Sequence, residues 1–487
     1  MNPSLNKDIH LLPAEIISDI LNLTAAASTP EFWSHPGGPA PELRTELERL
    51  ENAPLLLLSR VCSRWHDIAL KTPLLWSNIQ IHGMTEAALE ESVWLLTERL
   101  DRSGSAPLAI SLQCEHDSQS PHPRFLHLLA EHSHRWETVC MSRCCIRGFD
   151  TSILRGNVPH LKILWLDVET RFGLSDPDAP IDFFAVAPHL ERLWLAAPLV
   201  NSDSVRQILH RKQLKSFGCV AMFPQEFRDG LSLLPQLPPG AHAHIALDLD
   251  HRILKLHHIS PFHLPPLSTC ISSLVCRTTQ LFHAADVSSA LTQIFTSLTL
   301  SALQQMSLGC NDYPHIALDW STALRVQFIA LCRRSALGRC LTTLRVVEVH
   351  ITERDLLKIL SVLTALEHLE VGDAPPTVKH SLLITDSFVR AMAGTALGNC
   401  FVPRLSRFVC VTRFMFRQKL LVDFVESRLT RLAALDNPTA FHLHIHAFPD
   451  SKCGLDPRVH AILSELAKTE SLFFYESLEA HRYTLVG

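Results

Sequence analysis

The sequence predicts a protein of mixed α/β class, in which a small helical hairpin is followed by an irregular solenoid of short strands and helices. Near the N-terminus, two segments place their large apolar side chains on one side of a helix. Downstream, short apolar strands recur at intervals of 24–29 residues with helical segments between them, and a fixed period of this size is typical of solenoids. We therefore expect the hairpin in residues 1–80, the solenoid in residues 81–450 and a C-terminal cap in residues 451–487.

The first helix of the hairpin is predicted to begin at Pro13. Proline is favoured in the first turn of a helix, where its missing N–H group has no partner to lose. Ile16, Ile17 and Ile20 follow at helical spacing, and together with Leu12 they form one apolar face.

An insertion at about residues 24–53 separates the two helices of the hairpin. Its segment 29–41 contains six Pro or Gly among 13 residues, so we expect a mobile surface loop. Residues 42–50 then follow as a short charged helix. Because a long surface loop costs little free energy, the insertion does not argue against pairing of the two flanking helices.

The second helix is predicted from an apolar repeat. Leu57, Val61, Trp65 and Ile68 recur at i, i+4, i+8 and i+11, with charged residues between them. So few residues cannot bury so many large side chains among themselves. Part of this apolar surface is therefore expected to contact a partner.

Three motifs follow one another in this region: L-P-x-E-I-x-x-x-I from Leu12, V-C-x-R-W-x-x-I-A from Val61 and P-L-L-W from Pro73. In this order they resemble the F-box over the first 80 residues. The resemblance implies docking on a Skp-family adaptor, which bridges to a cullin-based ubiquitin ligase. In that family Pro13 and the Val61-Cys62 pair would lie close to the adaptor, with Trp65 supporting the hairpin. The adaptor-binding residues implied by the resemblance are Leu12, Pro13, Ile16, Ile17, Ile20, Leu57, Val61, Cys62, Trp65 and Ile68.

The repeat is visible in the spacing of equivalent apolar strand positions. These positions are Ile110, Val139, Leu164, Leu193, Phe217, Ile245 and Leu274. Residues 159–166 and 188–195 are nearly identical copies, and their x-L-x-x-L-x-L form resembles leucine-rich repeats. The Asn or Cys that usually closes such a repeat is missing from most copies, and Leu366 to Leu405 spans 39 residues. We therefore expect an irregular, degenerate leucine-rich-repeat-like solenoid.

Helices are expected between the strands, because apolar residues there recur at helical rather than alternating positions. The clearest are residues 85–100, 324–332, 353–363 (started by Thr352) and 414–435.

Two tryptophans occupy equivalent positions in the two closest repeat copies. Strand alternation points Trp165 and Trp194 away from the flanking leucines, so they are expected to stack on the open strand face. Large aromatic side chains on such a face are frequent binding hot spots; packing at a repeat edge is the alternative. With Arg192 they are our expected target-binding residues, and Lys162, Glu191 and Arg345 are expected to steer target association electrostatically.

Composition narrows the function further. The net charge of −5, from 44 basic and 49 acidic residues, argues against a phosphate-backbone binder. The N-terminus has no secretory pattern, and no apolar run approaches the ~20 residues that span a bilayer. We expect a soluble protein of the cytoplasm and/or nucleus, with its 14 cysteines reduced.

Metal and cofactor sites are not expected. His442, His444 and His446 alternate along one strand, but no cysteine pair accompanies them at a zinc-binding spacing; solvated strand-face histidines are the simpler interpretation. Cys140, Cys144 and Cys145 follow His132 and His134, yet Cys140 falls in a strand, where a small buried thiol is common.

An enzymatic role is also not expected. The sequence has no glycine-rich phosphate loop, nucleophile elbow or H-E-x-x-H motif. Asp248, Asp250 and His251 are the best acid–base candidates, although a solvated loop explains them more simply.

We therefore predict a substrate-receptor subunit of an SCF-type ubiquitin ligase, which binds a Skp-family adaptor, through it a cullin, and a target protein of unknown identity. The alternatives are an F-box protein that acts with the adaptor outside ubiquitin ligases, and an enzyme with an unrecognised site.

Overall fold

The computed structural model divides the chain into two compact units, residues 1–208 with 486–487 and residues 209–485. Each unit is described by itself. The residues that the structure describes are 12–27, 61–82, 89–113, 123–142, 150–167, 183–196, 203–209, 213–221, 224–247, 265–278, 284–310, 318–347, 349–373, 382–394, 401–435, 438–447, 454–469 and 471–477.

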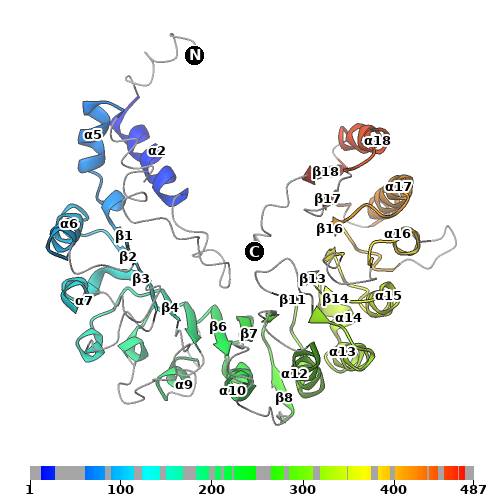
Figure 1. Ribbon diagram of the computed structural model, residues 1–487, viewed down its shortest axis with the longest axis horizontal. Helices are drawn as coiled ribbons and strands as arrows, with labels where there is room; N and C mark the ends of the chain where they lie inside the picture. The colour runs from blue at the N-terminus through cyan, green and yellow to red at the C-terminus, as the bar shows by residue number, and fades with distance from the viewer. Residues whose placement is uncertain are drawn as a thin grey trace. The chain divides into compact units, whose positions relative to one another are not determined.

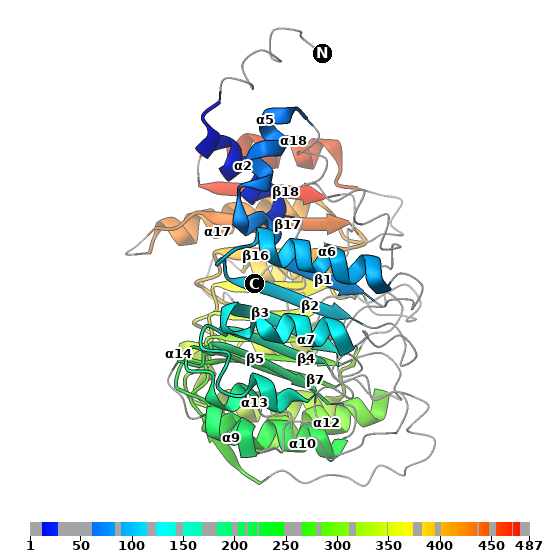
Figure 2. The same ribbon diagram turned by 90° about the vertical axis from the view of Figure 1, so that its left-hand side faces the viewer.

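The first unit begins with helices and continues as a parallel sheet. The helical part consists of α2 (Ala14–Ala27), α5 (Ser63–Leu70) and the 3-10 turn η3 (Pro73–Trp76). The strands are β1 (Asn78–His82), β2 (Leu108–Gln113), β3 (Trp136–Ser142), β4 (Ile163–Asp167) and β5 (Arg192–Ala196), paired in parallel in chain order. Figure 2 looks onto this sheet, where β1, β2 and β3 follow one another. Between the strands lie α6 (Leu89–Arg102), α7 (Pro123–Glu131), η6 (Ser133–Arg135), η7 (Thr151–Leu154) and η8 (Phe183–Val186), and α9 (Asp203–Leu209) ends at the unit boundary.

The second unit repeats the same arrangement. Its parallel strands, in chain order, are β6 (Ser216–Ala221), β7 (His242–Leu247), β9 (Ser273–Thr278), β11 (Gln305–Cys310), β13 (Thr343–Val347), β15 (His368–Gly372), β16 (Arg407–Thr412), β17 (Phe441–Ala447) and β18 (Leu472–Ser477). Its helices are α10 (Pro224–Ser232), η10 (Leu234–Gln236), α12 (Ala284–Ser297), α13 (Thr322–Arg334), α14 (Leu337–Cys340), α15 (Glu353–Leu360), α16 (Asp386–Ala393), α17 (Lys419–Ala433) and α18 (Pro457–Ala467).

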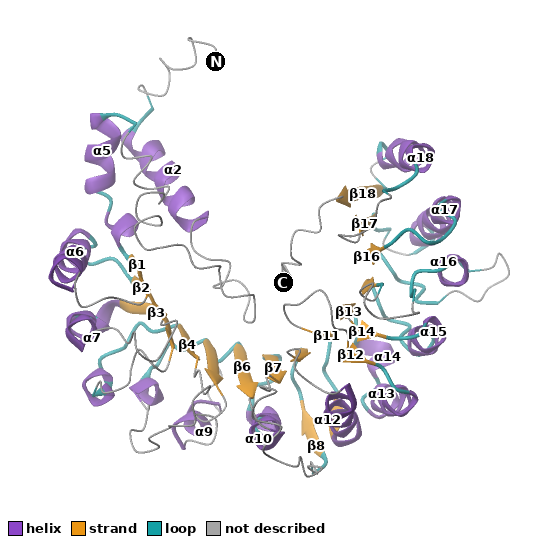
Figure 3. Ribbon diagram, viewed as in Figure 1, coloured by secondary structure: helices purple, strands orange, loops and turns teal. Residues whose placement is uncertain are grey.

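In each unit the helices cover one side of the sheet (Figures 1 and 3). Because successive side chains of a strand point to opposite faces of the sheet, every second residue faces these helices and forms the core with them. In β4 and β5, Leu164, Leu166, Leu193 and Leu195 are buried. The burial pattern of β17 alternates strictly between buried and half-buried residues. One face of each sheet is therefore packed against helices, and the other carries the remaining side chains.

The mixed helix and strand content and the large parallel sheet agree with the predicted class. The expected helices 324–332 and 353–363 are present as α13 and α15, and the Thr352 hydroxyl accepts a hydrogen bond from the N–H of Asp355 (3.2 Å) at the start of α15. None of the described helices is long and apolar enough to cross a bilayer.

The structure differs from expectation at two helix ends and in two short ladders. The helix expected from Phe414 begins only at Lys419, because Phe414 has a left-handed backbone (φ 55°) that a right-handed helix excludes. Helix α2 continues to Ala27 and so includes the start of the expected insertion. Two further ladders were not predicted, namely β8 (Leu267–Thr269) with β10 (Leu298–Leu300), and β12 (Leu318–Asp319) with β14 (Val349–His350). Their strands of two or three residues are too short for a periodicity signal.

Candidate functional site

The two N-terminal helices pack on a small apolar core of their own. Ile17 and Leu21 of α2 meet Trp65 and Ala69 of α5, and Leu75 of η3 closes the cluster. All five are buried. The one-sided apolar pattern of each helix thus becomes the inner face of the hairpin.

Polar contacts hold the same elements together. The Arg64 guanidinium donates to the carbonyl of Leu12 (2.7 Å), and the hydroxyls of Ser18 and Thr72 lie 3.1 Å apart. The indole N–H of Trp76 donates to the carbonyl of Ala69 (2.9 Å). These contacts join α2, α5 and η3, so the hairpin is one packed unit.

Large aliphatic side chains remain exposed on the outside of this hairpin. Ile16 is 43% exposed, Val61 50% and Leu74 54%, and the ring of Pro13 is exposed as well. We call these four residues the apolar patch. Pro13 and Ile16 lie one turn apart at the start of α2, and the Arg64–Leu12 hydrogen bond brings Val61 to the same end of the hairpin. Exposed apolar residues that gather in this way are typical of a protein–protein contact.

The structure divides the residues that the sequence suggested for adaptor binding. Ile17 and Trp65 face the core of the hairpin, so they support the surface from below. Leu12, Ile20, Cys62 and Ile68 are half-buried at its edge, whereas Pro13, Ile16 and Val61 are exposed. Leu57 lies outside the described residues.

Sequence reasoning did not single out Leu74, the fourth member of the patch. The run Pro73-Leu74-Leu75-Trp76 contains two adjacent leucines, and only η3 geometry sends Leu75 inward and Leu74 outward.

The hairpin continues directly into the first sheet. Strand β1 begins two residues after η3, and the N–H of Ala109 in β2 donates to the carbonyl of Ser77 (3.0 Å). The guanidinium of Arg102 lies over the Trp76 ring, 4.7 Å from its centroid. This cation–π contact joins the end of α6 to the hairpin.

The two tryptophans of β4 and β5 stack as the register predicts. Trp165 is paired with Trp194, and their rings lie 4.6 Å apart at 20°. Trp194 is only 5% exposed, Trp165 is half-buried and Arg192 is exposed. Of the expected target-binding residues, Trp165 and Arg192 therefore keep accessible surface in this unit, and their role in target binding stays a prediction.

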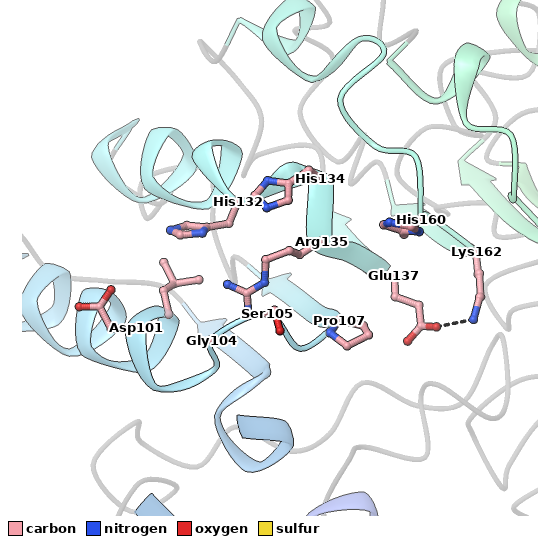
Figure 4. Close-up of a pocket in the computed structure, with 11 residues that line it drawn as sticks. Asp101, Gly104, Ser105, Pro107, His132, His134, Arg135, Glu137, His160 and Lys162 are labelled. Carbon is pink, nitrogen blue, oxygen red and sulfur yellow. Dashed lines mark hydrogen bonds and ion pairs between the residues drawn. The ribbon is translucent and has the colours of Figure 1, made fainter. Parts of the chain in front are cut away.

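A pocket of about 740 Å³ opens beside β2, β3 and β4 (Figure 4). Its lining includes His132, His134, Glu137 and Lys162, and the Lys162 ammonium donates to the Glu137 carboxylate (2.5 Å). Arg135, also in the lining, donates to the carbonyl of Ala106 (3.0 and 2.9 Å) and to the Ser103 hydroxyl (2.5 Å). The two cationic side chains of the pocket, Lys162 and Arg135, are thus already bound by groups of the protein itself. We therefore interpret the pocket as part of the structural framework.

Burial, reinforced by the charge of Arg135, lowers the pKa of the His132 imidazole. His132 is therefore a neutral ring at physiological pH.

Most of the remaining chemical candidates lie outside the part of the chain that the structure describes. Cys140 is buried in β3, and Cys144 and Cys145 lie outside the described residues, as do Asp248, Asp250 and His251. Within the part of the chain that the structure describes, no three His, Cys, Asp or Glu side chains are placed to hold a metal ion.

Residues 9–82 match the F-box-like family model, a span that contains α2, α5, η3 and β1. No curated protein matches the chain. The matched segment contains the whole core of the hairpin. Residues 9–82 therefore carry an F-box-like domain, as in F-box proteins.

Proposed function

We propose that this protein is the substrate-receptor subunit of a cullin-RING (SCF-type) ubiquitin ligase. The F-box-like domain binds a Skp-family adaptor, and the strands that follow bind a target protein. The main observation behind this proposal is the exposed apolar patch of Pro13, Ile16, Val61 and Leu74. The patch belongs to the hairpin with its own core, within the segment that matches the F-box-like model.

The physical argument for adaptor binding is the cost of exposed apolar area. Covering a large aliphatic side chain contributes roughly 1.5–3 kcal/mol. Ile16 in α2, Val61 just before α5 and Leu74 in η3 are held by a common core and so form a preorganised contact. Preorganisation lowers the entropy that association must overcome.

The remainder of the chain supports a receptor role. We interpret its parallel strands, which follow chain order in each unit, as a degenerate leucine-rich-repeat-like solenoid. Such an arrangement offers an extended open face to a partner. The receptor needs no catalytic group of its own, because holding a target near the charged enzyme raises its effective concentration. We place the complex in the cytoplasm and/or nucleus.

A pull-down with a recombinant Skp-family adaptor tests the proposal. Ile16→Asp combined with Val61→Asp should abolish adaptor binding, because both charges enter the apolar patch. Val186→Asp is the matched control: Val186 is 44% exposed in the same unit, outside the patch. Adaptor binding that survives the double substitution would contradict the proposal.

The ligase itself requires a second readout. Cullin should co-purify with the wild-type chain and be lost with the double variant. Adaptor without cullin would instead favour an F-box protein that acts outside ubiquitin ligases.

A further inference from the structure

Strands β15 to β18 carry a row of rings on the face that the helices leave open. The register places His368, Arg407, His442 and Phe473 side by side on four neighbouring strands. Two residues along, His444 lies beside Tyr475, and His446 follows in β17. We call these seven residues the ring face.

The opposite side of the same strands is fully packed. Phe408 contacts the rings of Phe388 in α16 and Phe424 in α17, with centroids 6.5 and 5.5 Å apart. Leu443 and Ile445 of β17 are buried with them. Because strand side chains alternate, the ring face must point away from these helices.

The rings contact one another and remain accessible. His442 stacks on Phe473 with centroids 4.6 Å apart and planes at 11°. Tyr475 lies 5.8 Å from His444 and 6.1 Å from His446. Phe473 is 53% exposed and Tyr475 54%. Exposed aromatic rings that are already held in place lose little entropy when a partner covers them.

Arg407 gives the ring face its charge. Arg407 is an exposed residue, and no ion pair joins it to a carboxylate of the described residues. Glu370, two residues along β15 from His368, is 5% exposed and is bound to Arg345 at 2.7 Å. Burial, followed by the charge of Arg407, lowers the pKa of His368 to about 4 and also lowers the pKa values of His442 and His444. At neutral pH the face is therefore one cation among neutral rings.

We propose that the ring face docks a target segment in which an acidic side chain and an aromatic side chain lie three residues apart. The carboxylate pairs with the planar fork of Arg407, which is suited to carboxylate binding, and the aromatic ring stacks beside Phe473. This proposal rests on the proposed function, because the occupant is the target protein.

The spacing of the motif follows from sheet geometry. Arg407 in β16 and Phe473 in β18 are two strands apart, which is about 9.5 Å at the usual strand spacing. A peptide in the polyproline II conformation rises ~3.1 Å per residue with three residues per turn. Residues i and i+3 then lie on the same side about 9 Å apart, which matches the distance to be bridged.

Fluorescence polarisation with labelled ten-residue peptides tests this inference on the full chain, both alone and mixed with a Skp-family adaptor. A peptide with Glu and Phe three residues apart should bind about tenfold or more tightly than its Lys-for-Glu counterpart. It should also bind better than a peptide in which Glu and Phe are adjacent. Arg407→Glu should abolish binding, whereas Arg407→Lys should retain part of it.

Arg404 supplies the matched control, because it is an exposed arginine three residues before Arg407 and outside β16. Arg404→Glu should leave peptide binding unchanged. Equal binding of the Glu and Lys peptides, or equal loss in the two arginine variants, would overturn the inference. A dimer of the chain that disappears with Arg407→Glu in sedimentation would assign the face to a second copy and overturn it as well.

Adaptor pull-down on the same samples separates the two proposals. Absence of peptide binding by the wild-type chain, with its adaptor binding intact, counts against the ring face alone. The reverse result counts against the F-box function alone.

Discussion

Arg64 and Leu12 are joined by a hydrogen bond of 2.7 Å from the guanidinium to the backbone carbonyl, across 52 positions of sequence. The contact fixes the start of α2 against the first turn of α5. It therefore sets the spacing between Pro13 and Val61, two members of the apolar patch.

Removing this contact should weaken adaptor binding while leaving the fold intact. A single hydrogen bond contributes about 1 kcal/mol net, so Arg64→Ala should raise the adaptor Kd a few-fold in a titration by calorimetry. Arg124→Ala, which removes an exposed arginine paired with Glu90 on α6, should have no effect on that Kd. Equal Kd values for the wild type and Arg64→Ala would show that the contact does not position the patch.

Trp65 should be essential for the hairpin. Truncation of a buried Trp typically costs ~3–5 kcal/mol, which is comparable with the stability of a small helical unit. Trp65→Ala should abolish adaptor pull-down, while circular dichroism of the remaining chain changes little. Pro13→Ala should be gentler, because it removes contact area and leaves α2 intact.

Trp65→Phe provides the internal control. The indole N–H of Trp65 has no hydrogen-bond partner among the described residues, so Phe loses packing volume only. It should retain most adaptor binding. An unchanged pull-down with the Trp65→Ala and Pro13→Ala double substitution would refute the F-box interpretation.

Asp373 should be important for the second unit. Its buried carboxylate accepts hydrogen bonds from the N–H groups of Leu383 (2.8 Å), Ile384 (2.9 Å) and Arg413 (3.0 Å) and from the Thr412 hydroxyl (3.1 Å). In Asp373→Asn an amide NH₂ replaces one accepting oxygen, and buried donors lose their partner. We expect the free energy of unfolding to fall by ~1–3 kcal/mol, as measured by urea denaturation.

Thr412→Val is the companion variant, because it keeps the shape of the side chain while it deletes one of the four donors to Asp373. It also deletes the hydroxyl that accepts a hydrogen bond from the Phe414 N–H (3.1 Å). It should cost less than Asp373→Asn. A larger loss of stability for Thr412→Val would mean that the two hydrogen bonds of this hydroxyl outweigh the backbone hydrogen bonds to the carboxylate.

Stability should fall on mild acidification because of His368. Its folded-state pKa of about 4 lies below the usual value of 6.5, so the unfolded chain binds the proton more tightly. The contribution of His368 to the free energy of unfolding is therefore complete above about pH 6.5 and is lost as the pH falls toward 4. Urea midpoints at pH 7 and pH 5 should differ more for the wild type than for His368→Gln. An identical difference in both proteins would contradict the assignment.

The sequence by itself determined the element types and the hairpin. Residues 353–360 form a helix because their apolar side chains recur at helical spacing and Thr352 provides the N-cap hydroxyl. The recurrence of short apolar segments predicted the strands, and the stacking of Trp165 on Trp194 followed from their equivalent repeat positions. The insertion segment 29–41 lies outside the described residues, so its mobility stays a prediction.

Only the tertiary structure decided which apolar residues of the hairpin are core and which are surface. Ile16 and Ile17 are adjacent and chemically identical, yet one is 43% exposed and the other fully buried. His442, expected to be a solvated strand-face side chain, is half-buried and stacked on Phe473. The physical reason is that sequence periodicity is local, whereas strand register and helix packing join residues tens of positions apart.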